Sequence, residues 1–356
     1  MDMVPLPVQP NAGATCSLLL RALDERARAL GLSLQDTNCH DALIADMRRL
    51  LADLPSDGAR LHGFRTQAMF AHVSFALGNA VKELDGGVLL SGSAEDRSPD
   101  FLVAPRDTSS ILVEVKNYFK GPRCGPLKIK RRYVSALKAC ARFMNLPLYF
   151  AVYWSRWNLW TLTASDRLDH RDKEWLQISF GDALMRNEMS LLGDYSVGTT
   201  PPISLRVYTD ATSPRKVQND GMVHARIERA CLSVGGDEIE DPFERKVAWF
   251  FMLYGKWHRI QNPVRIEDDE LIFLEMEVSP EHVEEDQNFQ MVGFMSEMFS
   301  AQYNQLTTGN GNVLRLAPLD TTTKIGIEIP RGYEGSALKL WRFEQLPNFR
   351  RTGPMT

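Results

Sequence analysis

SPDFLVAPRDTSSILVEVKNYFKG, residues 98–121, is the stretch that decides how this sequence folds. Two short apolar runs, FLVA and ILVEV, flank a polar stretch whose length and composition predict an antiparallel hairpin. Three charged residues stand within or beside the two runs, namely Asp100, Glu114 and Lys116. A charge buried in a strand is costly unless it is paired or binds a metal. We therefore expect these charges to serve a function.

The predicted hairpin brings the three charges together. With a turn near 106–109, Asp100 at the start of one strand approaches Glu114 near the end of the other. Glu114 and Lys116 are two residues apart, so their side chains leave the strand on one face, while Val115 points into the core. Two carboxylates beside a lysine suit Mg²⁺, which prefers oxygen ligands and retains several waters. Such an ion polarises a phosphate and lowers the pKa of a bound water, and the lysine can position or deprotonate that water.

Pro99-Asp100 followed by Glu114-Val115-Lys116 resembles the motif of the PD-(D/E)xK phosphodiesterase superfamily, the fold of many restriction endonucleases and Holliday-junction resolvases. The resemblance covers roughly residues 63–165. It implies an α/β fold with a restriction-endonuclease-like core, which is a mixed sheet flanked by helices. It also implies a metal-dependent endonuclease in which Asp100 and Glu114 bind Mg²⁺ or Mn²⁺ and Lys116 is the catalytic lysine. The expected substrate of this endonuclease is DNA. A role of the protein in host defence or in a mobile element is also expected.

Many members of this superfamily add an acid from the helix that precedes the first strand. Residues 63–84 have the apolar period of such a helix, and its candidate contributors are Gln67 and Glu83. Glu83 lies near the predicted end of the helix, where an exposed terminal glutamate is the simpler interpretation. Some members have glutamine or no acid at this place, so this departure is compatible with activity.

A strongly basic segment follows the proposed catalytic strand. From Val115 to Ser165 there are ten lysines and arginines and no aspartate or glutamate, although the whole chain has a formal net charge of −4. This local charge predicts contacts with nucleic-acid phosphates near the metal. A helix is predicted over 126–144, and a solvated helix face is the alternative for any single residue. The candidate nucleic-acid-binding residues are Lys120, Lys128, Lys130, Arg131, Arg132 and Tyr133.

The chain divides into four predicted parts. Residues 1–13 are proline-rich and expected to be flexible, and 14–56 form a helical segment with helices near 16–31 and 41–54. The nuclease-like domain is expected over 57–197. GTTPP at 198–202 is the predicted linker to a second, α+β domain over 203–356.

Other chemistries and compartments find no support in the sequence. Five cysteines without CxxC or Cys/His spacing indicate neither a disulfide framework nor a zinc site. No P-loop, GxGxxG or GxSxG motif is present. Because there is no run of 18 apolar residues and no basic stretch before the first apolar patch, the protein is expected to be cytoplasmic, without a membrane span.

Two alternatives to a nuclease stay open. The first is a catalytically inactive protein that keeps the nuclease fold and binds nucleic acid or another protein, which the uncertain helix acid motivates. The second is an interaction protein in which the acidic stretch between 267 and 286 contacts a partner. DNA is the expected partner and RNA stays open. A homodimer or a protein partner through the C-terminal domain is also considered, since a double-strand cut from one site per chain suggests pairing.

Overall fold

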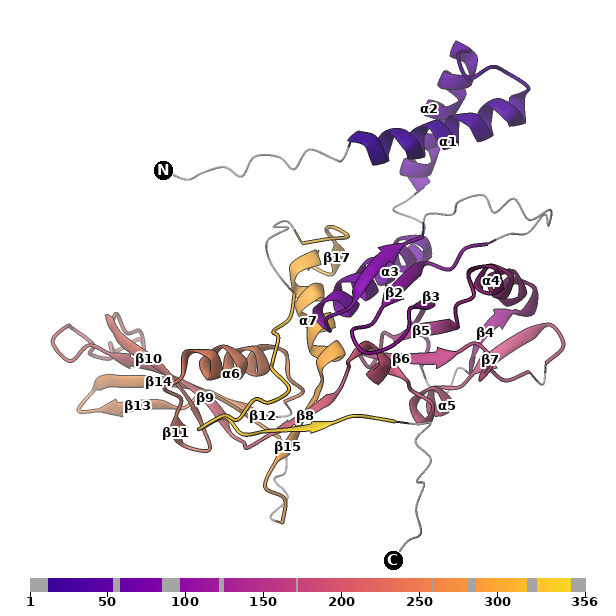
Figure 1. The fold of residues 1–356 in the computed structure, drawn as a ribbon. Coiled ribbons are helices and arrows are strands. Elements are labelled where there is room, and N and C mark those ends of the chain that lie inside the picture. Colours follow the sequence, from indigo (N-terminus) through magenta and orange to yellow (C-terminus); the bar gives the residue numbers. More distant parts are fainter. Residues whose placement is uncertain are drawn as a thin grey trace, which may run out of the picture. The chain divides into compact units, whose positions relative to one another are not determined.

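The chain forms two compact units, Met1–Gly63 and Phe64–Thr356 (Figure 1). Two predicted segments lie outside the described residues. They are most of the proline-rich segment 1–13 and a strand that the sequence GVLLSGS suggests over 87–93. None of the described helices is long and apolar enough to cross a membrane. The computed structural model describes residues 12–53, 58–84, 97–121, 125–170, 172–257, 259–280, 286–318 and 325–346.

The first unit contains the two helices predicted near its start. They are α1 (Ala12–Leu30) and α2 (Thr37–Asp53), linked by an ion pair of 3.2 Å between Arg26 Nε and Asp46 Oδ2. Helix α1 ends where Gly31 adopts a φ of +66°, a conformation that favours glycine. The amide of Leu32 then bonds back to the carbonyl of Ala27 at 2.9 Å, which closes the helix.

The second unit carries the hairpin of residues 98–121 in a five-stranded mixed sheet. The strand order is β1-β2-β3-β5-β6, in which β3 and β5 are parallel and the other neighbours are antiparallel. Helix α4 (Arg131–Met144) connects the parallel pair. The mixed α/β fold predicted from the sequence is thereby confirmed. The strands are β1 (Ala80–Glu83), β2 (Phe101–Ala104), β3 (Ile111–Tyr118), β5 (Leu148–Trp154) and β6 (Leu159–Ala164).

Both faces of β3 are covered, which explains why its sequence is apolar on both sides of the pleat. Val113 and Val115 belong to one buried cluster with Phe70 of α3 (Gly58–Ala76). Leu112 faces the other way and belongs to a second cluster with Leu137 of α4. A charge on β3 therefore lies between two apolar layers and needs a specific partner.

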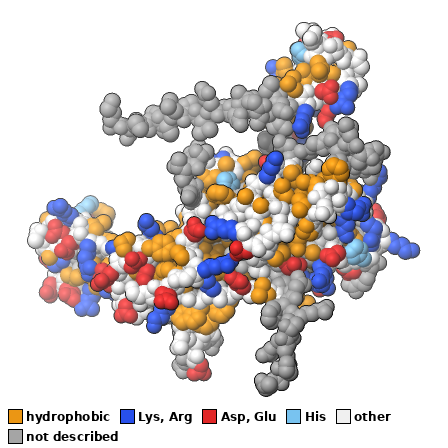
Figure 2. Space-filling view, viewed as in Figure 1, with side chains coloured by type: hydrophobic (Ala, Val, Ile, Leu, Met, Phe, Trp, Pro, Cys, Tyr) orange, Lys and Arg blue, Asp and Glu red, His pale blue; other side chains and the backbone are white. Residues whose placement is uncertain are grey.

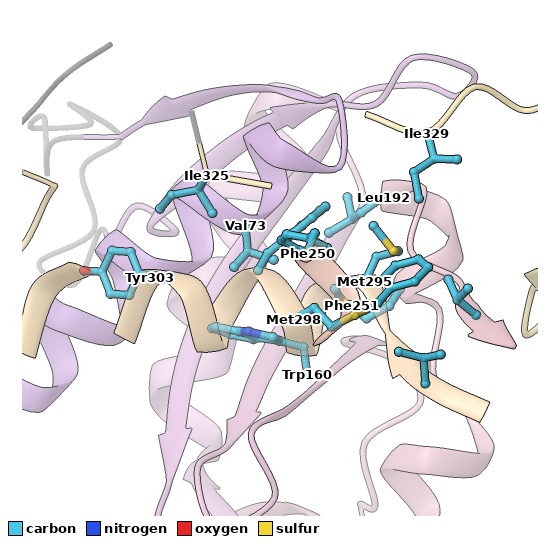
Figure 3. Close-up of a cluster of buried hydrophobic side chains, with 14 of the residues drawn as sticks. Val73, Trp160, Leu192, Phe250, Phe251, Met295, Met298, Tyr303, Ile325 and Ile329 are labelled. Atoms are coloured by element: carbon cyan, nitrogen blue, oxygen red, sulfur yellow. The ribbon is translucent and has the colours of Figure 1, made fainter. Parts of the chain in front are cut away.

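The first cluster extends into the C-terminal part of the unit. Figure 3 shows Trp160 of β6 beside Met298 of helix α7 (Met295–Thr307), with Phe251 of helix α6 (Pro242–Tyr254) nearby. Trp160 Nε1 also donates a hydrogen bond of 2.9 Å to Ser300 Oγ. Trp154 and Trp160 are both buried, as expected for core aromatics.

A six-stranded antiparallel sheet dominates the C-terminal part. Its order is β11-β10-β9-β14-β12, and β13 also pairs with β14. Its strands are β9 (Ile203–Thr209), β10 (Ile227–Val234), β11 (Asp237–Glu238), β12 (Arg259–Gln261), β13 (Val264–Glu267) and β14 (Glu270–Ser279). The smaller elements are β4 (Leu127–Lys130), β7 (Trp175–Ile178), α5 (Phe180–Met185), a 3₁₀ turn (Met189–Leu192), β8 (Ser196–Thr199), β15 (Gln290–Phe294), β16 (Thr308–Gly309), β17 (Asn312–Val313) and β18 (Leu340–Phe343).

The stretch predicted as a linker, 198–202, begins inside strand β8. Strand β8 lies between β15 and β18 in a three-stranded sheet. Thr199 is fully buried, and its hydroxyl donates a hydrogen bond of 2.9 Å to the carbonyl of Lys339. The division into 57–197 and 203–356 stays a prediction.

The helix predicted over 63–84 ends earlier than expected, and this boundary was wrong. Helix α3 stops at Ala76, because Gly78 takes a φ of +102° and the Asn79 amide bonds to the carbonyl of Ser74 at 3.1 Å. The Asn79 side chain donates to the Leu192 carbonyl, 113 residues away, at 2.9 Å. The chain then enters β1, so Glu83 is on a strand and not on the helix.

The helix predicted over 126–144 begins later than expected. Its first residues form β4, which pairs antiparallel with β7, and α4 starts only at Arg131. Lys128 and Lys130 are therefore exposed strand residues, while Ile129 between them is buried. The alternation in LKIK is the strand period, and a partner strand more than 40 residues later completes the pair.

Candidate functional site

The hairpin register places Asp100 beside Glu114. Phe101 of β2 pairs with Val113 of β3, so Asp100, one residue earlier, faces Glu114, one residue later. Asp100 Oδ2 accepts a hydrogen bond of 2.7 Å from the amide of Val115. The structure therefore brings together Asp100 and the Glu114–Lys116 segment, as the sequence suggested. The catalytic role of these residues stays a prediction.

Glu114 is the most deeply buried charge of the site, with 1% of the residue exposed. Its Oε1 atom accepts hydrogen bonds from Lys116 Nζ and from the hydroxyl of Tyr133, at the start of α4. Its Oε2 atom is buried and has no hydrogen-bond partner among the described residues. Buried polar atoms normally have a partner, and this oxygen has none among the described residues. Because an ionised carboxylate oxygen only accepts, a cation is a suitable partner for it.

Asp100 is held by one side chain and one backbone amide. Gln67 Nε2 of α3 donates to Asp100 Oδ1 at 2.7 Å. Burial, followed by the charge of Glu114, raises the pKa of Asp100 to about 7, although the Val115 amide and Lys116 act in the opposite direction. Two carboxylates crowded in a partly dry site carry an electrostatic penalty that a divalent cation would remove.

Glu83 lies close to this pair, although its predicted location on the helix was wrong. It sits on β1 opposite Phe101, the residue after Asp100, and its charge contributes to the raised pKa of Asp100. Glu83 is exposed, so its carboxylate remains in contact with water. The helix contributes Gln67, an amide donor, in place of an acid.

The two carboxylates fit a magnesium or manganese ion. Among the described residues, no three His, Cys, Asp or Glu side chains gather closely enough to form a metal cage. Mg²⁺ does not require such a cage, because it usually binds one or two carboxylates and completes its octahedron with waters and phosphate oxygens. Asp100 and the free Oε2 atom of Glu114 supply that minimal set.

Tyr133 contacts Glu114, and two cationic side chains, Lys116 and Arg97, lie beside its ring. Lys116 Nζ lies 3.4 Å from the hydroxyl of Tyr133 and 4.8 Å from the centre of its ring. The guanidinium carbon of Arg97 lies 5.2 Å from the same ring centre. Burial, then the charge and hydrogen bond of Glu114, raises the pKa of Tyr133, so its hydroxyl stays protonated and donates. Sequence reasoning missed Arg97, which stands only three residues before Asp100.

The predicted basic residues differ in how they are used. Arg131 donates to three carbonyls, those of His170, Asp172 and Lys173, and so holds the loop before β7. Lys120 is exposed beyond β3, and Lys130 Nζ lies 5.8 Å from the ring centre of Trp175. Figure 2 shows Lys and Arg side chains gathered at the edge that α4, β4 and β7 occupy in Figure 1. The basic surface therefore borders the carboxylate site. Within it, Arg131 holds the loop before β7.

Removing the Asp100 charge is expected to stabilise the metal-free protein at neutral pH. A carboxyl with a raised pKa contributes its full stabilisation below about pH 3.8 and loses it as the pH rises through about 7. Asp100→Asn cannot ionise, and the Gln67 amide can rotate to face the new side chain. Urea unfolding in EDTA should show a gain of about 1–3 kcal/mol at pH 8 and little change at pH 4. A loss of stability at pH 8 would contradict the electrostatic account of the site.

Comparisons with known proteins identify no family for this chain. No protein-family model matches it, and no curated protein sequence matches it. Among solved structures, it is similar to that of Archaeoglobus fulgidus Hjc, described as a Holliday junction resolvase from an archaeal hyperthermophile. The similar region covers 36% of this chain and 95% of the resolvase, at 20% sequence identity and a TM-score of 0.30. This similarity is weak.

Proposed function

We propose that the chain is a metal-dependent endonuclease with a PD-(D/E)xK core, which hydrolyses phosphodiester bonds in DNA. One observation carries the proposal: Glu114 Oε2 is buried without a hydrogen-bond partner among the described residues, in a site that also holds Asp100 and Lys116. Asp100 and Glu114 would hold Mg²⁺ or Mn²⁺. Such an ion, when bound, would lower the pKa of a water and polarise the scissile phosphate.

The remaining residues of the site orient the two carboxylates. Gln67 and the Val115 amide fix the Asp100 carboxylate through its two oxygens. Tyr133 and Lys116 both bond to Oε1 of Glu114, which leaves Oε2 as the oxygen available to a cation. Lys116 would then position the attacking water, or deprotonate it as the neutral amine, or offset charge in the transition state as the ammonium.

Nucleic acid would reach the site over the neighbouring basic surface. Lys120, Lys128 and Lys130 are exposed and can contact phosphates without sequence preference. Such contacts predict binding that weakens steeply as salt increases. Arg132, the second residue of α4, is also exposed.

Tyr133→Phe is expected to weaken metal binding about 10–100-fold while the protein stays folded. The phenol is a positioning group, because it touches Glu114 and not the proposed ion. Removal of an outer-shell donor typically costs this much affinity. Titration of Mn²⁺ followed by electron paramagnetic resonance would measure it. Tyr149→Phe on β5 is the matched control, and equal Mn²⁺ affinities in the two variants would count against the role of Tyr133.

A second candidate function is a catalytically inactive nuclease-fold protein that binds nucleic acid or a protein partner. The observation that favours it is that no three His, Cys, Asp or Glu side chains of the described residues, Glu83 included, gather closely enough to hold a metal ion together. The test of both candidates is cleavage of plasmid, linear and branched DNA with Mg²⁺ or Mn²⁺, by wild type and by Asp100→Ala. Metal-dependent cleavage that the substitution abolishes supports the endonuclease. Binding without any cleavage supports the second candidate.

A further inference from the structure

Phe119 is an exposed aromatic residue directly after the strand that carries Glu114 and Lys116. Strand β3 ends at Tyr118, and 65% of the Phe119 residue is accessible to water. It comes three positions after Lys116, so about 10 Å lies between their Cα atoms at the rise of a strand. That length corresponds to about three base steps of a DNA strand. The Cα atom of Phe119 therefore lies within a few nucleotide lengths of that of Lys116.

The backbone that presents Phe119 is fixed by hydrogen bonds. Ser155, in the turn between β5 and β6, donates to the carbonyl of Tyr118 from its amide at 3.1 Å and from its hydroxyl at 3.3 Å. Arg156 Nε donates to the carbonyl of Phe119 itself at 3.2 Å. The exposed ring is therefore carried by a backbone segment whose conformation is fixed by hydrogen bonds. A backbone held in this way loses little conformational freedom when the side chain meets a ligand.

The aromatic neighbours of Phe119 all pack against the protein. Tyr118 is buried, with its ring centre 5.0 Å from that of Trp154. Trp157, in the same turn as Arg156, stacks on Phe180 with 4.3 Å between ring centres. Within this described group, the Phe119 ring is the one directed to water. It lies next to Lys120, which is also exposed.

We propose that Phe119 stacks on an unpaired base of the DNA substrate, so that the site prefers branched or single-stranded DNA to an uninterrupted duplex. The inference rests on the proposed nuclease function and names its substrate class. Every base has a π-face, and stacking on an aromatic side chain is a sequence-tolerant contact. Bases in an intact duplex are stacked on each other, so the ring gains such a contact only where bases are unpaired. Lys120 and Arg156 supply cations for the adjoining phosphates.

The test measures binding of two DNA probes in Ca²⁺. One is a forked DNA with 2-aminopurine in its unpaired arm, and the other is a duplex of the same length. Phe119→Ala should weaken fork binding about 5–100-fold and leave duplex binding within twofold. Phe119→Trp should retain fork binding and the quenching of 2-aminopurine fluorescence, whereas Phe119→Leu should lose both. Phe143→Ala is the matched control, since Phe143 on α4 is 72% exposed and lies about 15 Å along the helix from Tyr133.

Two results would overturn the inference. One is a Phe119→Ala variant that binds the fork as tightly as wild type, and the other is an equal loss on fork and duplex. Cleavage in Mg²⁺ separates this failure from that of the proposed function. If wild type and Phe119→Ala cut all substrates equally while Asp100→Ala cuts none, the nuclease stands and the stacking role falls. If wild type cuts nothing, the nuclease proposal falls, and the binding data still decide whether Phe119 stacks.

Discussion

Lys116→Ala is expected to lower the rate of Mg²⁺-dependent DNA cleavage by about 10²–10⁴-fold, the usual contribution of a positioned general acid or base. The ammonium contacts Glu114 Oε1 and lies beside Tyr133, at the edge of the carboxylate pair. Its loss removes the group that acts on the attacking water or on transition-state charge. Single-turnover cleavage of a labelled fork would measure the chemical step.

Lys116→Arg distinguishes the two roles of the lysine. Arginine keeps the positive charge but does not release a proton at neutral pH, so it restores activity only if charge is what matters. Lys339→Ala, at an exposed lysine of the C-terminal part, is the control and should cut at the wild-type rate. A Lys116→Ala variant that also cuts at that rate would remove Lys116 from the mechanism.

Glu244→Ala is expected to destabilise the protein by about 3–5 kcal/mol, the largest stability loss that the structure suggests outside the core. Glu244 lies in the first turn of α6, and 4% of the residue is exposed. Its carboxylate accepts hydrogen bonds from the amides of Ser336, Ala337 and Leu338, the last two at 3.1 and 3.0 Å. Alanine would leave these three amides without their acceptor, in a segment that runs from the exposed Ser336 to the buried Leu338.

The same residue predicts how stability depends on pH. Burial alone would raise the pKa of Glu244, but the amides of Leu338, Ser336 and Ala337 outweigh it and hold the pKa below the usual value. A lowered pKa in the folded state means that the stabilisation is present above the unfolded pKa of about 4.5 and is lost as the pH falls through the folded pKa. Urea unfolding from pH 7 to pH 3 should therefore show the penalty of Glu244→Ala shrinking as the pH falls. Glu228→Ala, at an exposed position of β10, should change stability by less than about 0.5 kcal/mol.

The hairpin and its three charges were predictable because their signals are local. Alternation, turn composition and the two-residue spacing of Glu114 and Lys116 all lie within residues 98–121 and determine the register. The resemblance implied that the preceding helix contributes a side chain beside Asp100. The sequence left Gln67 and Glu83 as the two candidates for that side chain. The structure decides it through a hydrogen bond of 2.7 Å.

The features that sequence reasoning missed depend on distant partners. Asn79, just after the end of α3, is held by the carbonyl of Leu192, and β4 forms because β7 pairs with it. The guanidinium of Arg131 donates to carbonyls about 40 residues later, and its predicted contact with nucleic acid stays a prediction. Arg97 approaches the site only because the chain brings it over the ring of Tyr133. Local periodicity contains none of these contacts.

Mn²⁺ binding tests the central claim most directly, namely that Asp100 and the free oxygen of Glu114 hold a divalent cation. Electron paramagnetic resonance titration should show one Mn²⁺ site in the wild-type protein, competed by Mg²⁺, and no such site in Asp100→Asn. Because that variant is expected to be at least as stable as wild type at pH 8, unfolding does not explain the loss. Equal Mn²⁺ binding by the two proteins, or no binding by wild type, would contradict the account.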